Sequence, residues 1–236
     1  GGGPIFSGDN KWLGYSVSPD YKTQEALRNE KKPIIRAFEL LNLVSGETTR
    51  VENVANFSFS RDGRFLSLKP NPDLKSESKT ANIIVRNLAT GADVTFGNVK
   101  DYAWSDQGSM LAFTIETKDM IGSGVMLFDG KVSVVLDSRQ AVYSNLTWRR
   151  DSGDLAVLRS QKTSGYTLPT NNILVWKNVS TSATAVSEFD PIERTDFPKE
   201  KRILDKKQLQ WALDGNSIFF SIDTRERSPE KPKNDE

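Results

Sequence analysis

Two features of the sequence predict an all-β fold. The first is a ten-residue pattern in which an aromatic residue, a tight turn and an apolar run follow one another, as at residues 59–68. Asp62-Gly63 supplies the turn, because glycine adopts positive φ without penalty and aspartate bonds nearby backbone amides. The second feature is recurrence, since five copies begin 53, 45, 44 and 63 residues apart. A period of this size with short strands predicts a β-propeller or another β-repeat array.

The five copies agree at four positions, which a chance collection of Asp-Gly hairpins would not do. The leading residue is always aromatic: Phe6, Phe59, Trp104, Trp148 and Trp211. The fourth residue is a turn former: Asp9, Asp62, Gln107, Asp151 and Asp214. The eighth and tenth residues are apolar or aromatic in every copy. We call the turn of each copy its anchor turn.

A second hairpin follows each of the first four anchor hairpins. The sequence marks these second hairpins at 36–51, 81–96, 124–136 and 172–186. Each unit therefore has four strands, which is the blade of a β-propeller. The predicted β-propeller occupies 1–222 and has about four and a half four-stranded antiparallel blades. The full blades lie near 5–54, 55–99, 100–140 and 141–190, and the half blade lies near 203–222.

The remaining segments are predicted to connect or extend the blades. Residues 16–34 include a charged, helix-favouring stretch, which predicts a short surface helix or an excursion. Residues 69–80 and 187–206 contain prolines and charges typical of long loops. The charged segment 223–236 is predicted to be a disordered tail. An incomplete blade leaves an unpaired edge, so we expect the chain to be a fragment of a larger propeller. The alternative is a small ring whose last hairpin is paired by another segment.

Composition limits the chemistry that these residues can perform. The 32 basic and 31 acidic residues nearly cancel, which gives no basic surface for nucleic acid. No apolar run reaches the ~18–20 residues of a membrane span. Cysteine and histidine are both absent. The chain thus cannot assemble a Ser-His-Asp triad or a histidine metal site, and we predict no catalytic, cofactor-binding or metal-binding residue and no cofactor. Substrate-binding residues are not identifiable from the sequence.

Several residues have both a functional and a structural interpretation. The five leading aromatic residues could line a binding face, but one equivalent place per blade favours packing between sheets. The anchor-turn aspartates could suggest calcium, but single carboxylates in separate blades favour turn capping. Asn56, Asn145 and Asn178 match glycosylation acceptors, but Asn56 and Asn145 lie next to predicted core strands. Arg149-Arg150 could hold a peptide carboxylate, although a solvated turn is the favoured interpretation.

The repeated F-S-x-D-G-x-x-L motif resembles TolB-like and dipeptidyl-peptidase-like propellers, and it fits WD repeats less well. More specifically, 54–66 resembles the N-terminal propeller of bacterial prolyl-oligopeptidase-family serine peptidases. Further stretches share this resemblance: 85–91, 95–99, 122–125 and 155–160. It covers nearly the whole chain.

The resemblance implies a peptidase whose chemistry lies in a C-terminal α/β-hydrolase domain, with a G-x-S-x-G serine. Gly122-Ser123-Gly124 lacks that spacing and is interpreted as turn material, so no catalytic residue transfers to this chain. The implied partners are that hydrolase domain and peptide substrates, which the propeller would gate and select. A periplasmic or secreted bacterial location is expected, with the cytoplasm as an alternative.

The rival hypothesis is a stand-alone β-propeller module that binds a protein or glycan partner. An enzyme acting through carboxylates alone is disfavoured, because no paired acidic motif stands out in the sequence.

Overall fold

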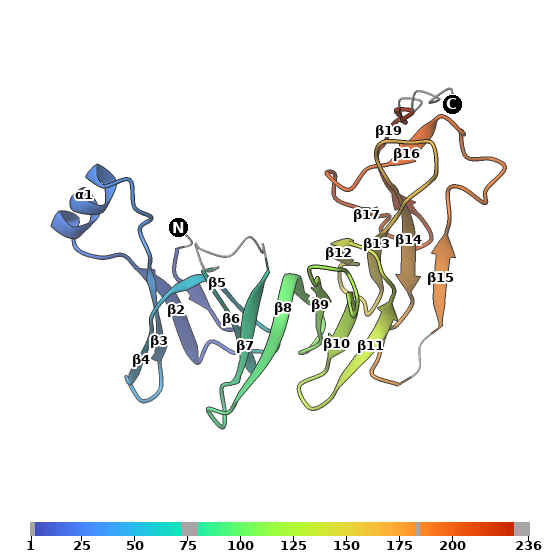
Figure 1. Cartoon of the computed structure of the whole chain (residues 1–236). Coiled ribbons are helices and arrows are strands. Elements are labelled where there is room, and N and C mark those ends of the chain that lie inside the picture. The colour runs from blue at the N-terminus through green and yellow to red at the C-terminus, as the bar shows by residue number, and fades with distance from the viewer. Residues whose placement is uncertain (1–2, 72–79, 183–184, 229–236) are drawn as a thin grey trace.

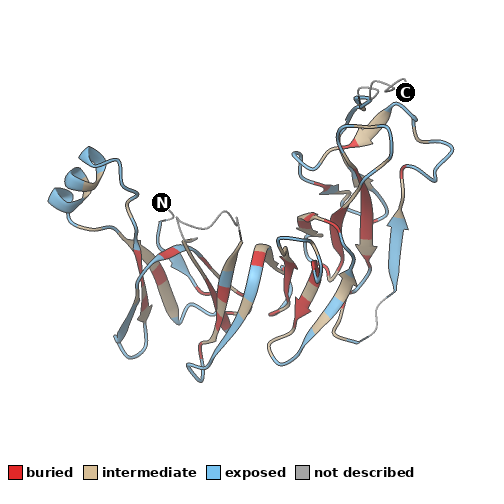
Figure 2. Cartoon of the chain, viewed as in Figure 1, coloured by how far each residue is buried: buried red, intermediate tan, exposed pale blue. Residues whose placement is uncertain are grey.

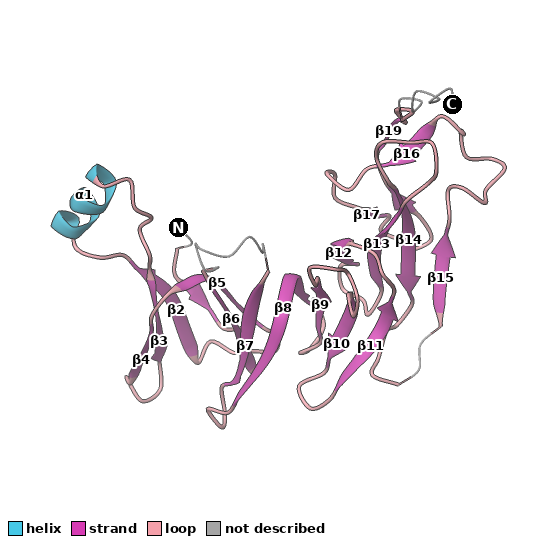
Figure 3. Cartoon of the chain, in the orientation of Figure 1, coloured by secondary structure: helices cyan, strands magenta, loops and turns pink. Residues whose placement is uncertain are grey.

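The computed structural model describes residues 3–71, 80–182 and 185–228, and its regular structure is almost entirely antiparallel strand (Figure 3). The first sheet has the order β1-β2-β3-β4 and comprises β1 (Ile5–Phe6), β2 (Trp12–Val17), β3 (Ala37–Asn42) and β4 (Thr48–Val51). A later sheet has the order β12-β13-β14-β15 and comprises β12 (Tyr143–Trp148), β13 (Leu155–Gln161), β14 (Thr170–Trp176) and β15 (Val186–Phe189). Each is a four-stranded meander, as predicted for a propeller blade.

The seven strands between these sheets form two further blades that share one long strand, β8 (Asp93–Trp104). The other members are β5 (Val54–Phe59), β6 (Phe65–Pro70), β7 (Ala81–Asn87), β9 (Leu111–Ile115), β10 (Gly124–Phe128) and β11 (Ser133–Ser138). The start of β8 pairs with β7 and its end pairs with β9. Between the two parts Asn98 has φ 54°, so the backbone bends there. The four blades follow one another in an open arc (Figure 1), and the predicted propeller fold is confirmed.

A fifth, incomplete unit follows the fourth blade. β16 (Lys201–Ile203) pairs with β19 (Ile222–Thr224), and β17 (Gln210–Trp211) pairs with β18 (Ile218–Phe219). The prediction that 223–236 is disordered is therefore wrong for 223–228. Their backbone continues β19, and the Ser228 amide donates to the Gly165 carbonyl at 3.0 Å, so backbone pairing outweighs the polar composition. Residues 229–236 lie outside the described residues.

The predicted surface helix is α1 (Tyr21–Asn29). Asp20 caps it by accepting a hydrogen bond from the Thr23 amide at 3.0 Å, which satisfies one of the free amides of the first turn. None of its residues is buried, so α1 is an excursion at the surface and adds nothing to the core. In the described part of the chain, no helix is long and apolar enough to span a membrane.

The core lies between the blades and is supplied by their middle strands (Figure 2). β9 and β13 are buried along almost their whole length, whereas β4, β11 and β15 are largely exposed. Between the third and fourth blades, Ala112 and Leu127 pack in one cluster with Val157 and Trp176. Strands with neighbours on both faces are therefore the apolar ones, and the fourth strand of each blade forms its solvent side.

The five anchor turns close in the same way. The amide of the second residue of each copy donates to the carbonyl of the seventh at 2.8–2.9 Å. The pairs are Ser7–Trp12, Ser60–Phe65, Ser105–Met110, Arg149–Asp154 and Ala212–Ser217. In the first two copies, the hydroxyl of the second residue also accepts the amide of the seventh residue. These hydrogen bonds join the Ser7 hydroxyl to the Trp12 amide at 3.0 Å and the Ser60 hydroxyl to the Phe65 amide at 2.9 Å. A single local geometry thus starts every blade.

Successive anchor turns also touch one another. A Cβ on Gly8 would lie 1.9 Å from the Arg61 carbonyl oxygen, so only glycine allows the first two turns to approach. The Gln107 side-chain amide donates to the Asp151 carbonyl at 2.6 Å, which joins the third turn to the fourth. The anchor strands of neighbouring blades therefore lie side by side, as expected of the first strands of propeller blades.

The three anchor tryptophans link each blade to the one before it. The Trp104 indole donates to the Ser67 hydroxyl at 3.0 Å. The Trp148 indole donates to the Ala103 carbonyl at 3.0 Å, and the Trp211 indole donates to the Thr147 carbonyl at 3.1 Å. Besides the predicted packing, each of these tryptophans thus forms a hydrogen bond to the preceding blade. Phe6, in contrast, is 57% exposed on the edge strand β1.

We expect Trp148→Phe to lower the free energy of unfolding by about 1–2 kcal/mol, because the Ala103 carbonyl loses its donor inside a blade interface. Trp12→Phe is the matched control, since Trp12 packs against a core cluster but its indole donates to none of the described residues. Urea denaturation would measure both. Equal losses in the two variants would contradict a role for the indole hydrogen bond.

Candidate functional site

The anchor-turn aspartates cap turns, with one exception. Asp9 and Asp62 accept the amides of Lys11 and Arg64 at 3.2 Å. Asp214 accepts the Asn216 amide at 3.0 Å. Capping is therefore confirmed for these three aspartates. Within the described ranges, no group of three or more acidic side chains could hold a metal ion.

Asp151 is the exception, because its side chain is 84% exposed and accepts no backbone amide among the described residues. In this turn Asp154 takes the structural role: it accepts the Asn178 amide at 2.9 Å, Arg149 Nε at 2.8 Å and Lys177 Nζ at 3.0 Å. Burial acts to raise the pKa of Asp154, but these hydrogen bonds outweigh burial and hold its pKa below the ordinary value. Arg149 is thus committed to the turn and is not free to bind a peptide carboxylate.

The motif around Ser123 is turn material, as predicted. Gly122 has φ 78°, and the buried Ser123 hydroxyl accepts the Thr117 amide at 3.2 Å. A serine held in this way serves the loop between β9 and β10.

A cavity of about 670 Å³ lies beside the fourth blade and is lined mostly by polar and charged side chains. It is bounded by the connection from β11 to β12, by β13 and β14, and by β15 with the loop that follows it. Its lining includes Arg139, Arg159, Gln161, Asn172, Asp190 and Arg194. We call this space the polar cavity.

The position of the polar cavity follows from the strand alternation of β13. Leu155 and Val157 point toward the third blade and pack in the core between the two blades. Arg159 and Gln161 continue the same face, because successive residues of a strand alternate sides. Arg159 pairs across the sheet with Tyr143 on β12 and Asn172 on β14. The apolar interface between the blades therefore changes into a polar one toward the end of β13.

Arg159 is the centre of this polar interface, and its side chain is only 6% exposed. It donates to Asp137 of β11 at 3.1 Å and also to Glu188 of β15. The Tyr143 hydroxyl donates to the same Asp137 carboxylate at 2.5 Å. Burial, and then this hydrogen bond to a carboxylate, raise the pKa of Tyr143. One guanidinium thus joins the fourth strands of two neighbouring blades.

Two side-chain amides in the polar cavity are only half satisfied. Gln161 Nε2 donates to Asp190 at 3.2 Å, and Asn172 Nδ2 donates to Asp190 at 3.2 Å and also to Glu188. Because carboxylates only accept, both amides must turn their nitrogen atoms toward them. Their oxygens, Gln161 Oε1 and Asn172 Oδ1, are buried and accept nothing from the described residues. Two residues that line the polar cavity therefore carry buried acceptors without a donor among the described residues.

These residues do not stand out in the sequence as a site. The one sign of the site in the sequence is Arg159, a charged residue that falls on the same face of the predicted strand as the apolar Leu155 and Val157. Its partners come from four strands, and the spacing of the chain does not reveal which of them meet.

No family model matches this chain, and no curated protein matches it. Several solved structures are similar to this chain. The chain is similar to the β-propeller domain of the trilobed protease from Pyrococcus furiosus, with 15% identity and a TM-score of 0.48 over 80% of this chain and 56% of that one. It is similar to the acylaminoacyl peptidase of Pyrococcus horikoshii, with 15% identity and a TM-score of 0.41 over 76% of this chain and 31% of that one. It is also similar to an oligogalacturonate lyase from Vibrio parahaemolyticus, with 12% identity and a TM-score of 0.47 over 94% of this chain and 58% of that one.

The chain therefore spans a little over half the length of the first of these structures and about a third of the second. The similar structures include two peptidases and a lyase. Because one fold carries many activities, function must be argued from the site.

We expect Arg159→Met to lower the free energy of unfolding by about 3–5 kcal/mol, because the Asp137 carboxylate, whose side chain is only 14% exposed, loses its buried cationic partner. Arg194→Met is the control: the side chains of Arg194 and its partner Asp196 are 53% and 66% exposed, so the expected change is within about 0.5 kcal/mol. Chemical denaturation measures both variants. Adding Asp137→Asn to Arg159→Met should recover part of the loss, and equal effects of the two single variants would contradict the argument.

Proposed function

We propose that this chain is a non-catalytic propeller domain of a peptidase-like protein and that it binds and selects peptide substrates. The observation that carries the proposal is the pair of buried, unused acceptors in the polar cavity, Gln161 Oε1 and Asn172 Oδ1. Leaving a buried acceptor without a donor costs about 1–3 kcal/mol. A ligand that brings N–H donors recovers this cost, and an extended peptide offers a backbone N–H at almost every residue.

The charges around the polar cavity also suit a peptide. Arg139 and Lys162 contribute positive charge, while Glu193 and Asp190 contribute negative charge. A surface of both signs accommodates the carbonyls, amides and charged side chains of a peptide, whereas a polyanion would meet the carboxylates. The volume of about 670 Å³ lies within the range of pockets that enclose small ligands.

We also propose that the domain controls the access of peptides to a separate catalytic domain. The long connections between second and third strands, including α1 and the segment from 162 to 169, lie on the same side of the blades at opposite ends of the arc (Figure 1). Lys162 of the second connection lines the polar cavity. Peptides bound there would be held at the loop end of the blades. Without histidine, the chain's own residues cannot complete a Ser-His-Asp triad, so the hydrolytic step is assigned to a separate domain.

The direct test is peptide binding. Short unstructured peptides that carry a fluorophore on an internal lysine should bind the whole chain, as measured by fluorescence anisotropy. Gln161→Leu should weaken binding about tenfold, because it removes one acceptor, and each 1.4 kcal/mol is a tenfold change. Gln208→Leu, at an exposed position away from the polar cavity, is the control. Binding that is equal in wild type and Gln161→Leu would contradict the role of the polar cavity, and hydrolysis of the peptides by the pure chain would contradict a non-catalytic domain.

A second test separates the proposal from a stand-alone module that binds a protein or glycan. A native extract of the source cells is treated with a fluorophosphonate probe, and an antibody against this chain then captures its parent. We expect a labelled band far larger than 26.4 kDa, the mass of this chain. An unlabelled band of about that mass would replace the peptidase proposal with the binding-module hypothesis.

A further inference from the structure

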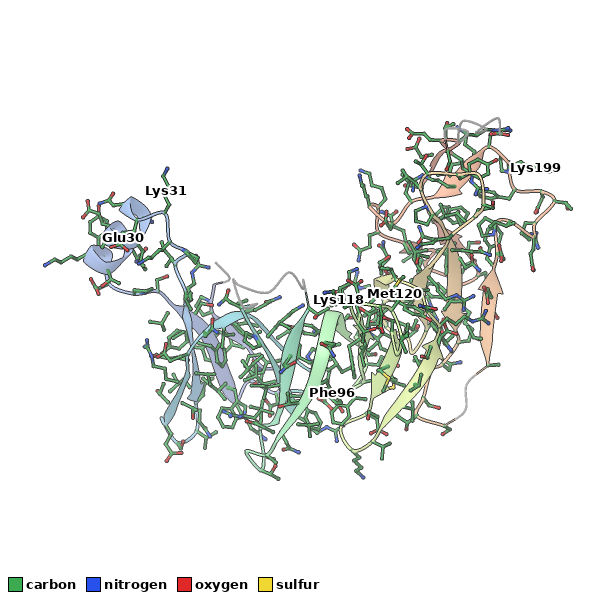
Figure 4. All side chains as sticks on the ribbon, viewed as in Figure 1. Glu30, Lys31, Phe96, Lys118, Met120 and Lys199 are labelled. Atoms are coloured by element: carbon green, nitrogen blue, oxygen red, sulfur yellow. The ribbon has the colours of Figure 1, made fainter. Side chains whose placement is uncertain are left out.

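A second, smaller cavity of about 220 Å³ adjoins the polar cavity and has a different charge. It is bounded by the loop that precedes β14, by the segment from 191 to 201 and by Arg225. Four of its lining residues are cationic, namely Arg194, Lys199, Lys201 and Arg225, and none is acidic. Lys199 lies on the loop at the outer side of the fourth blade (Figure 4). We call this space the cationic cavity.

Arg225 is held in place without its charge being neutralised. Its guanidinium carbon lies 3.6 Å from the centre of the Tyr166 ring, a cation–π contact, and its backbone amide donates to the Glu200 carbonyl at 2.9 Å. Nε and Nη2 of Arg225 are buried and donate to none of the described residues. These two nitrogens form one edge of the guanidinium, and that edge matches the two oxygens of a carboxylate.

The carboxylates nearby are engaged elsewhere. Asp196 accepts two hydrogen bonds from Arg194, at 2.9 and 2.8 Å. Glu200 lies 3.6 Å from Arg227, in a pair whose two side chains are both more than half exposed. Among the described residues, Arg225 therefore keeps a positive edge that no carboxylate pairs with.

The remaining lining favours an organic carboxylate over inorganic phosphate. Ile192, Phe197 and two prolines form the apolar part of the cationic cavity. An apolar group next to a carboxylate would contact these side chains, whereas a hydrated phosphate would leave them without a partner. Arg194 lines both cavities, so a ligand in the polar cavity can continue past it into the cationic one.

We propose that the cationic cavity binds the free C-terminal carboxylate of a peptide and its last apolar side chain. This inference rests on the proposed function, since it assigns one end of the peptide whose backbone lies in the polar cavity. The domain then selects peptides that have a free carboxyl end, and Arg225 is its specificity-determining residue.

The test compares two peptides of one sequence that ends in leucine, one with a free carboxyl end and one amidated, both labelled on an internal lysine. The wild-type chain should bind the free acid at least about tenfold more tightly, because only the acid satisfies the buried guanidinium edge. Arg225→Gln should abolish this preference, and Arg225→Lys should reduce it, since lysine keeps the charge and loses the fork. Arg227→Gln, at an exposed arginine on the same strand end, should keep the preference.

A titration with benzoate, followed by NMR at the Arg225 Nε–H resonance, tests the site without a peptide. We expect saturable shifts in wild type and in Arg227→Gln. If the acid and the amide bind equally and benzoate leaves the resonance unmoved, the carboxylate site is overturned while peptide binding stands. If no peptide binds but benzoate still shifts the resonance, the proposed function fails, and with it the assignment of a peptide terminus. Thermal unfolding shows which Arg225 variant remains folded.

Discussion

The structure depends on the hydrogen bond that closes each anchor turn. The amide and carbonyl that it joins sit five residues apart, so the first two strands of a blade leave the turn in a fixed register. The next turn then packs against it, most closely where Gly8 meets the Arg61 carbonyl. A local hydrogen bond thereby sets the relation between neighbouring blades, and the tryptophan indoles extend this relation along the first strands. The apolar clusters and the cavities between blades take their positions from this relation between neighbouring blades.

The parts of the fold that could be predicted from the sequence are those that local chemistry decides. Aromatic residues, turn formers and alternating apolar positions within ten residues specify a hairpin, and their recurrence specifies the blades. Asp20 and the charged stretch after it specify α1 in the same way. The strand β19 was missed because its partner, β16, lies about twenty residues earlier in a charged segment, and composition gives no sign of that pairing. Asp151 was assigned a capping role by its position, whereas Asp154 has that role because it pairs with Arg149 across the closure.

The polar cavity was unpredictable for a related reason. Arg159, Asp137, Asn172 and Glu188 come from four strands of two blades, and a strand pattern shows only that Arg159 lies on a buried face. A buried ion pair costs desolvation, and apolar residues of similar size often serve stability as well or better. The polar end of this interface therefore calls for a reason other than packing. The unused oxygens of Gln161 and Asn172 supply one, because they make the interface incomplete until donors arrive.

A peptide that occupies both cavities, as we propose, would meet a different requirement in each. The polar cavity offers acceptors and asks for N–H groups, while the cationic cavity offers a guanidinium edge and asks for a carboxylate. A polypeptide has a direction, with amides along its length and a carboxylate at one end, so only one orientation satisfies both cavities. Arg194, which lines both, is neutralised by Asp196 and hence leaves the choice of anion to Arg225. Orientation of the peptide would then follow from the fixed order of the fourth blade and the hairpin after it, because β14, β15 and β19 hold the two cavities in sequence.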